Sequence, residues 1–367
     1  MVRRLDEGLR ALGRDSSVVS WAPVPRAEPG PSGWWAWTSA KITAAWARDR
    51  AARAAAATLR TALEADQYLV AVLDTGSFAV AHHLAGVPRW GLHVHWTPDL
   101  VLQPWRHLAG EGVPRILTVL VSLRMRVAGR SNRRLLRSAP FVVSLTSSHT
   151  RFWRDVGARV HEVGNPMDSS EIATRSRPEP GDPVTVGYLG RLSYEKGPDV
   201  LLDALRLVRD PERLIRTLVA GAGPLEPALR RQVADEHVPG VEFLGWVDDP
   251  RALLARIDVL VLPSRAEAVP LVLAEALAAG CVVVAAAAGG GVRDVLLDGQ
   301  LGTIVAREDP AALAHAIEQA VVSVRAGSLP DRTGVADLLE RHSPSHVLGA
   351  WVSLLDGQVG GAPPPAG

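Results

Sequence analysis

The apolar positions of the chain follow two periods, and their alternation along the sequence predicts an α/β fold. Short runs rich in Val, Ile and Leu are typical of buried parallel strands, whereas apolar residues that return every three or four positions are typical of amphipathic helices. In the second half of the chain the two kinds of segment alternate regularly. The strands expected there run through 187–189 and over 216–220, 241–244, 258–262, 281–285 and 303–305, and the expected helices include 225–234, 309–325, 346–355 and one that ends at 208.

The first half shows the same alternation with more interruptions. An amphipathic helix is predicted at 2–13, and the stretch 22–38, rich in Pro, Gly and Trp, predicts an irregular loop. The other elements expected in this half are strands at 17–21, 68–74, 89–95, 141–145 and 160–163 and helices at 39–65 and 77–84. The order of strands and helices indicates one Rossmann-like unit in each half.

Length and composition are those of a globular protein with two domains. The 367 residues exceed one ordinary core, and the chain is 47% apolar and 22% charged. The net charge of +1 creates no global field that would attract nucleic acid, so we expect no nucleic-acid partner. A single cysteine, Cys281, excludes an internal disulfide framework and fits a reducing compartment. Since the chain also lacks an apolar run of about 20 residues and a signal-peptide pattern, we expect a cytoplasmic protein.

The stretch 264–280 carries the first candidate chemistry. Glu267 and Glu275 flank Pro270, which we expect at the first position of a helix, where proline is tolerated. The strand expected at 258–262 leads into this loop. Both carboxylates and the helix N-terminus should therefore gather at the carboxyl edge of a parallel sheet, where α/β folds bind ligands. Two such glutamates also fit the solvated face of a surface helix, so the pair alone does not decide between the two interpretations.

A second candidate lies upstream, in the stretch 184–197. Here a strand, a turn at Gly190 and a helix follow one another, and the connecting loop holds Arg191 and Lys196. Glycine at such a junction lets the backbone approach a phosphate, and two cations held there can neutralise a diphosphate. This stretch therefore predicts a diphosphate site.

Together the two stretches resemble the retaining glycosyltransferases of family 4, which have the two-domain GT-B fold. The motifs are G-R-L-x(3)-K-G, here from Gly190 to Gly197, and P-S-x-x-E-x(7)-E, here from Pro263 to Glu275. The resemblance covers residues 183–325 in the expected order and is weaker before them. It implies an enzyme of polysaccharide biosynthesis that transfers a hexose from a nucleoside-diphosphate sugar, with retention of anomeric configuration, to a glycan, lipid-linked or small-molecule acceptor.

The resemblance also implies a role for each candidate residue. Arg191 and Lys196 would bind the diphosphate of the donor. Glu275 would bind the ribose hydroxyls, and Glu267 the hydroxyls of the transferred sugar. The other expected donor contacts are Gly190, Ser264, Pro270 and Leu271, with Gly245 and Trp246 beside the base. The donor is expected to be UDP- or GDP-linked, and no separate cofactor is implied.

The same resemblance points to His95 and to chemistry without a metal. In the family a histidine near the end of the strand expected at 89–95 faces the transferred sugar, and His95 matches this place best. A single histidine at a strand end equally fits an ordinary structural role. No His, Cys, Asp and Glu residues cluster at metal-ligand spacing, so we expect no metal. Ala268 departs from the family, whose members usually have Gly after Glu267, and it places a methyl group where the sugar approaches the backbone.

Arginine is concentrated in the segment before the second half, where no Asp or Glu occurs between Gly112 and Arg154. A basic amphipathic segment at 115–137 fits a peripheral contact with anionic lipid at the inner face of the plasma membrane. A solvated basic face whose arginines pair with acids elsewhere fits the same pattern. The arginines are Arg115, Arg124, Arg126, Arg130, Arg133, Arg134, Arg137, Arg151 and Arg154.

The domain boundaries follow from the resemblance and from the composition shift near 178–183. We expect an acceptor-side domain at 1–164, a linker at 165–182, a nucleotide-sugar-binding domain at 183–342, a helix at 343–356 that packs back on the first domain, and a disordered tail at 357–367. Family members usually open with a strand and a Gly-Gly loop before the first helix, whereas Met1 stands directly before that helix. We therefore expect the first domain to lack its N-terminal strand, either because Met1 is an internal start or because this copy is truncated.

Two other functions stay open at this point. A metal-independent nucleotide-sugar epimerase would share the architecture, but it would release a new free nucleotide sugar rather than a glycoside. A truncated, non-catalytic accessory protein would keep the nucleotide site and transfer nothing. The products formed from a nucleotide sugar distinguish the three functions.

Overall fold

The computed structural model describes residues 69–73, 90–94, 132–167, 169, 172, 182–209, 215–236, 238, 240–327 and 332–359. The chain divides into two compact units: unit 1 comprises Met1–Val163 and Leu348–Gly367, and unit 2 comprises Gly164–Val347. Several expectations lie outside the described residues, namely the elements between 2 and 65, the helix at 77–84, His95, the part of the basic segment before 132, the beginning of the chain and the tail beyond 359. The disordered tail expected at 357–367 is wrong for its first three residues, which form the end of a helix that runs to Val359.

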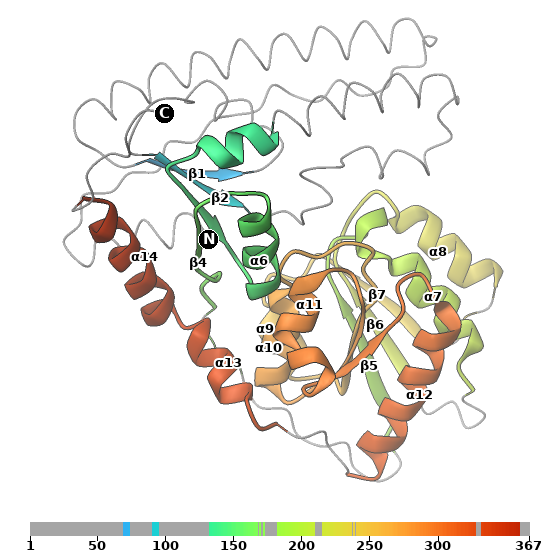
Figure 1. Cartoon of the computed structure of the whole chain (residues 1–367). Coiled ribbons are helices and arrows are strands. Elements are labelled where there is room, and N and C mark those ends of the chain that lie inside the picture. The colour runs from blue at the N-terminus through green and yellow to red at the C-terminus, as the bar shows by residue number, and fades with distance from the viewer. Residues whose placement is uncertain are drawn as a thin grey trace, which may run out of the picture. The chain divides into compact units, whose positions relative to one another are not determined.

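Unit 2 is built on one parallel six-stranded sheet (Figure 1). Its strands are β5 (Val184–Leu189), β6 (Ile215–Ala220), β7 (Val241–Gly245), β8 (Val259–Leu262), β9 (Val282–Ala286) and β10 (Thr303–Val305). Their order is β10-β9-β8-β5-β6-β7, so the chain runs from β5 to one edge and then builds the other edge from β8. This is the strand order of a doubly wound Rossmann sheet.

Alternate residues of the central strands enter two separate cores, one on each face of this sheet. In β8, Val259 and Val261 belong to one core, and Leu260 belongs to the other. β9 alternates in the same way, with Val284 in the first core and Val283 in the second. A strand that is covered on both faces must be apolar at every position, which explains the continuous Val and Leu runs in the sequence.

Helices cover both faces of the sheet (Figure 1). The core that contains Val259 is completed by α7 (Pro198–Leu207), α8 (Glu226–Asp235) and α12 (Pro310–Arg325). The opposite core is completed by α9 (Pro250–Leu254), α10 (Leu271–Ala279), α11 (Gly290–Val295) and α13 (Val335–Arg341). Each of the six strands expected in this half is present, and the α/β fold class is confirmed.

One local expectation for unit 2 needs correction, and three short helices were not predicted. Pro270 is the N-cap of α10 rather than its first residue, since its ψ of 86° is not helical and Leu271 is the first helical position. The chain turns just before the helix, where the amide of Leu271 donates to the carbonyl oxygen of Val269 at 3.0 Å. The helices α9, α11 and α13 were not predicted, because five to seven residues are too few to show a helical period.

Unit 1 contains a second parallel sheet, whose described strands follow the order β1-β2-β3-β4. They are β1 (Leu69–Leu73), β2 (Trp90–Val94), β3 (Phe141–Ser144) and β4 (Val160–Glu162), all expected from the sequence. The helix α6 (Ser147–Asp155) was not predicted, since Phe152 and Trp153 are the only large apolar residues in its sequence. Thr146 caps it by accepting from the amide of His149 at 3.3 Å, and Trp153 anchors it in the core.

The last helix, α14 (Pro344–Val359), begins in unit 2, and from Leu348 onward its residues belong to unit 1. In the part of the chain that the structure describes, no helix is long and apolar enough to cross a membrane. The end of the basic segment lies in a helix at 132–138, where Arg133 and Arg134 are exposed. The guanidinium of Arg137 donates to the carbonyl oxygen of Val156 at 2.6 Å, so this arginine serves the packing of unit 1.

Candidate functional site

The loops that follow β5 and β8 meet at the carboxyl edge of the unit 2 sheet. The two strands are neighbours, with Gly187 in register with Leu260. The chain continues from β5 to β6 on one side and from β8 to β9 on the other, so both loops leave the sheet where the strand order reverses. Open α/β sheets bind their ligands at such a point. The two stretches that the sequence singles out, 190–197 and 263–275, both begin there.

Glycines allow these loops to approach one another more closely than other residues would. Gly221, which follows β6, has a φ of 134°, and a Cβ on it would lie 1.8 Å from the carbonyl oxygen of Gly190. Gly197 has a φ of 63°, and its Cβ would lie 2.3 Å from the carbonyl oxygen of Pro263. Only glycine combines a positive φ with such close contact to backbone. The loops after β5, β6 and β8 are therefore packed backbone to backbone.

A buried tyrosine on β5 fixes the same region. The hydroxyl of Tyr188 donates to the carbonyl oxygen of Arg191 at 2.7 Å, and the side chain is fully buried. Burial, and after it the negative charge of Glu267, raises the pKa of the phenol above its ordinary value. Tyr188 thus remains a neutral hydrogen-bond donor throughout the physiological pH range and holds the loop that carries Arg191.

The structure brings three of the predicted site residues into direct contact. Lys196 Nζ lies 2.7 Å from Glu267 Oε1, although the two residues are 71 positions apart in the sequence. Ser264 Oγ lies 2.7 Å from the same oxygen. The Glu267 side chain is 6% exposed and that of Lys196 is 32% exposed, so the carboxylate is buried while part of the lysine side chain reaches solvent. This arrangement places the lysine where an anion can approach it, beside its carboxylate partner.

Arg265 joins the elements around this cluster and was not identified from the sequence. Its guanidinium donates to both oxygens of Asp199, at 2.9 and 2.7 Å, and to Glu308 at 2.9 Å. It also stacks on the ring of Tyr194 at 4.0 Å from the centroid and donates to that residue's carbonyl oxygen at 2.8 Å. The hydrogen bond with Asp199 is the main cause that raises the pKa of Arg265 above its ordinary value, so the guanidinium stays charged.

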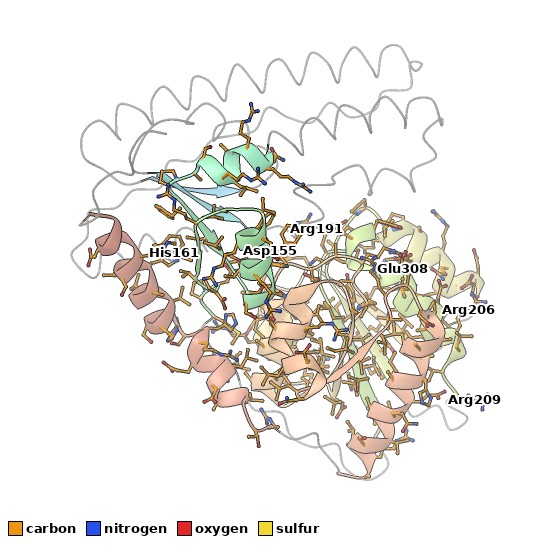
Figure 2. All side chains as sticks on the ribbon, in the orientation of Figure 1. Asp155, His161, Arg191, Arg206, Arg209 and Glu308 are labelled. Atoms are coloured by element: carbon orange, nitrogen blue, oxygen red, sulfur yellow. The ribbon has the colours of Figure 1, made fainter. Side chains whose placement is uncertain are left out.

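The partners of Arg265 explain why sequence reasoning missed it. They lie 66 positions before it and 43 positions after it, and no short motif connects them. In space, Arg265 ties the loop after β8 to the start of α7 and to the loop after β10, where Glu308 is labelled in Figure 2. The backbone of Arg265 also donates to the carbonyl oxygen of Glu195, the neighbour of Lys196, at 2.8 Å. This hydrogen bond fixes the backbone next to Lys196, the residue that carries the predicted cation.

Arg191, the other predicted cation, is arranged differently. Its side chain is 72% exposed and lies 3.8 Å from Glu195, a distance typical of a weak surface ion pair (Figure 2). The guanidinium can therefore move to meet a ligand at small cost, while the carbonyl group of the same residue is fixed by Tyr188.

The N-terminal end of α10 adds the remaining predicted residues of this stretch. Pro270 and Leu271 open the helix, and Glu275 lies in its second turn, about 6 Å along the axis from Leu271. Glu275 is half-buried. Nearby, a Cβ on Gly291 would lie 1.7 Å from the carbonyl oxygen of Ala268, so the first turn of α11 packs against the peptide that follows Ala268. The departure from the family at Ala268 thus lies at a tight backbone contact.

Gly245 is the last residue of β7, and Trp246 follows it at the same edge of the sheet. Gly245 has a φ of 68°, and its carbonyl oxygen accepts from the amide of Gly221 at 2.7 Å. Trp246 is 76% exposed, the most exposed large apolar side chain in the described part of the chain. Its indole N–H donates to Asp248 at 2.9 Å. A flat aromatic surface therefore stands at this edge, as stacking on a nucleobase would require.

Two further predictions concern histidine and metals. His95 lies outside the described residues, so its place relative to the cluster stays a prediction. Among the residues that the structure does describe, no three His, Cys, Asp or Glu side chains are grouped so that they could hold a metal ion. The charges available at the edge of the sheet are those of the side chains described above.

Comparison with known protein families matches the part of the chain that forms the unit 2 sheet. Residues 183–323 match the family described as glycosyl transferases group 1. The chain is 39% identical over 144 residues to a D-inositol 3-phosphate glycosyltransferase of Xylanimonas cellulosilytica, which covers 38% of this chain and 34% of the relative. It is 33% identical to a glycogen synthase of Mycobacterium tuberculosis over 163 residues, and this aligned stretch covers 44% of this chain and 39% of the relative. The chain thus spans little more than a third of the length of these relatives.

Solved structures resemble a larger part of the chain. The Anabaena protein HepE in complex with UDP-glucose has a TM-score of 0.61 at 20% identity, and the likeness covers 82% of each chain. The sucrose-phosphate synthase of Thermosynechococcus elongatus has a TM-score of 0.67 at 17% identity, covering 98% of this chain and 92% of the other. At these identities the likeness shows the fold, which is that of the GT-B class.

Proposed function

We propose that this chain, whose residues 183–323 belong to the glycosyl transferases group 1 family, is a glycosyltransferase that takes a hexose from a nucleoside-diphosphate sugar. One observation carries the proposal. At the point where the strand order of the unit 2 sheet reverses, the ammonium group of the partly exposed Lys196 is held 2.7 Å from the buried carboxylate of Glu267. A cation for phosphate thereby lies beside an acceptor for sugar hydroxyls, which is the chemistry that a sugar diphosphate presents.

In this proposal the two cations act on the leaving group. When the glycosidic bond breaks, negative charge develops on the diphosphate, and groups already aimed at it lower the barrier. Lys196 is preorganised by Glu267, and the positive end of the α10 helix dipole lies at the same edge. Arg191 is exposed and approaches the phosphates when the donor binds.

The other predicted residues bind the rest of the donor. Glu275 binds the ribose hydroxyls, Glu267 binds hydroxyls of the transferred sugar, and the base lies between the Gly245 peptide and the exposed indole of Trp246. UDP is our first choice of nucleotide because the HepE structures were obtained in complex with UDP and with UDP-glucose. The acceptor is a glycan, a lipid-linked saccharide or a small molecule, and the anomeric configuration is retained, with His95 next to the transferred sugar.

We also propose that the reaction needs no metal ion and takes place in the cytoplasm, where the basic segment around 115–137 contacts the inner face of the plasma membrane. Two points support the first part: Lys196 and Arg191 supply positive charge themselves, and no metal-ligand cluster occurs among the described residues. Activity should persist in excess chelator. Loss of activity on chelation, with recovery on addition of a divalent ion, would contradict this part of the proposal.

The decisive experiment is a panel of UDP-, GDP- and ADP-linked hexoses, tested first for binding by thermal shift and then for transfer by product analysis. Binding of one donor and formation of a glycoside with retained configuration are expected. Binding without transfer to any acceptor would favour the accessory protein, and release of an epimerised nucleotide sugar would favour the epimerase. Absence of binding to every donor would overturn the proposal.

A further inference from the structure

Ser264 was expected from the sequence to contact the donor, but its place in the fold points to another role. Its side chain is fully buried, with 0% of its surface exposed. Its neighbours in the chain, Pro263 and Arg265, are held by the close approach of Gly197 and by the ion pair with Asp199. A hydroxyl in this position does not reach a ligand in solvent, so its hydrogen bond must serve another residue of the site.

That residue is Glu267. The Ser264 hydroxyl donates to Glu267 Oε1 at 2.7 Å, and Lys196 Nζ donates to the same oxygen at 2.7 Å. The amide of Glu267 donates to the carbonyl oxygen of Ala288 at 3.0 Å, so the backbone is fixed as well. Among the described residues, none donates a hydrogen bond to the second oxygen, Oε2. Oε1 thus accepts two hydrogen bonds from the protein, whereas Oε2 can still accept a hydrogen bond from a ligand.

The two donors to Oε1 differ in how firmly they can hold it. The lysine side chain is long, flexible and 32% exposed, and in the proposed function it also contacts the diphosphate. The position of the serine hydroxyl oxygen depends on a single torsion angle, χ1, and the side chain is enclosed by protein, so it stays in place whether or not a nucleotide sugar is bound. Without the serine, the orientation of Glu267 would depend on a lysine that a phosphate competes for.

We propose that Ser264 is the positioning residue for Glu267: it fixes Oε1 so that Oε2 is presented to a hydroxyl of the donor sugar while Lys196 contacts the diphosphate. This inference rests on the proposed function, because it assigns Glu267 to the sugar. A carboxylate oxygen in one fixed orientation accepts from a sugar hydroxyl in one configuration, so Ser264 also contributes to the discrimination between epimeric donors.

The test separates the affinity for nucleotide from the use of the sugar. For Ser264→Ala we expect UDP to bind within about twofold of the wild type by calorimetry, since Lys196 remains, and kcat with UDP-glucose to fall about ten- to a hundredfold through loss of a hydrogen bond to a charged group. The preference for UDP-glucose over UDP-galactose should narrow. Thr217→Val is the matched control, because it removes another buried hydroxyl from the same unit, in the middle of β6, and should leave both measurements unchanged.

A double-mutant cycle decides whether Ser264 acts through Glu267. In a Glu267→Ala background, Ser264→Ala should have no further effect on kcat, because the residue it positions is gone. A merely structural role would instead lower activity by the same factor in both backgrounds and would lower the melting temperature. Equal kcat for wild type and Ser264→Ala, or additive effects in the cycle, would overturn this inference. A wild type that neither binds UDP nor transfers glucose would overturn the proposed use of UDP-glucose, which is a separate failure.

Discussion

The loops at the carboxyl edge of the unit 2 sheet are of two kinds. Those after β5 and β8 are connected by charged side chains, with Lys196 bound to Glu267 and Arg265 bound to both oxygens of Asp199. The loop after β7 presents an indole that is 76% exposed and that donates to Asp248, a residue only two positions away. One side of the candidate site is fixed by long-range ion pairs, whereas the other is an open aromatic surface.

This difference follows from the two parts of a nucleotide sugar. The diphosphate gains charge during transfer, and charge is stabilised best by groups that need not reorganise. A base is recognised by stacking, and stacking tolerates small displacements of the ring. We therefore expect substitutions in the fixed loops to act on turnover and stability, and substitutions at Trp246 to act on affinity alone.

The largest effect should come from Lys196→Ala. It removes the cation nearest to the developing charge and leaves the buried carboxylate of Glu267 without its ion-pair partner, so kcat should fall by at least about a hundredfold. Arg206→Ala is the control, because Arg206 lies in the last turn of α7, at the end opposite to Lys196, and forms a surface ion pair with Glu236, which follows α8. Steady-state kinetics with the accepted donor measures the effect. Near-normal turnover in Lys196→Ala would remove this residue from the site.

Arg265→Met should have the next largest effect, on stability. It keeps the length of the side chain but leaves the carboxylates of Asp199 and Glu308 unpaired. Since these are 35% and 51% exposed, water compensates in part, and we expect a loss of about 1–3 kcal/mol in the free energy of unfolding.

Urea unfolding of the whole chain measures the effect of Arg265→Met. Arg216→Met is the matched control, because it breaks an ion pair between two exposed side chains, Arg216 and Glu242, and should cost far less. Equal losses of stability in the two variants would mean that the ion pairs of Arg265 contribute no more than ordinary surface ion pairs.

A smaller effect is expected for Trp246→Ala. Loss of a stacking surface worth about 0.5–1.5 kcal/mol should weaken UDP binding about two- to tenfold. The melting temperature should not change, because the indole is exposed in the absence of ligand. Trp246→Phe keeps an aromatic face and should retain most of the affinity in calorimetry. Unchanged affinity in Trp246→Ala would show that the base does not stack there.

The smallest effect should be the pH dependence contributed by His342. Burial, opposed by its hydrogen bond to the Asn165 carbonyl and assisted by the charges of Arg341 and His346, lowers its pKa below the ordinary 6.5. The folded state therefore favours the neutral imidazole, and the stabilising contribution is complete above pH 6.5 and is lost as the pH falls toward the lowered value.

Thermal melts between pH 7.5 and 5.0 should show this loss, and His342→Gln should reduce it, whereas substitution of the exposed His315 should not. The difference in stability between Arg265→Met and Arg216→Met should persist over this range, since neither ion pair contains histidine. If this difference in stability vanished at acidic pH, the ion pairs of Arg265 would depend on another titrating group.

Local patterns were enough to predict most of the fold of unit 2. The continuous apolar runs at 259–262 and 282–285 require burial on both faces, which is why the strands and their parallel arrangement followed from the sequence. The glycines and cations of 190–197 and the glutamates after Pro263 have fixed spacing within one loop and one helix each, so the candidate residues could be named. The first residue of α10 could not be predicted, because a proline at the start of a helix fits both the N-cap and the first helical position.

By itself, therefore, the sequence determined which segments are strands, which residues carry charge and which loops follow which strands, since these properties depend on neighbours in the chain. Only the tertiary structure decided that Arg265 joins Asp199 to Glu308 and that Ser264 is buried against Glu267. Such partners meet because the strand order places β5 beside β8 and packs α7, α10 and the loop after β10 around that junction. A contact between residues 66 or 71 positions apart leaves no period in the sequence, and burial depends on everything that packs around a side chain.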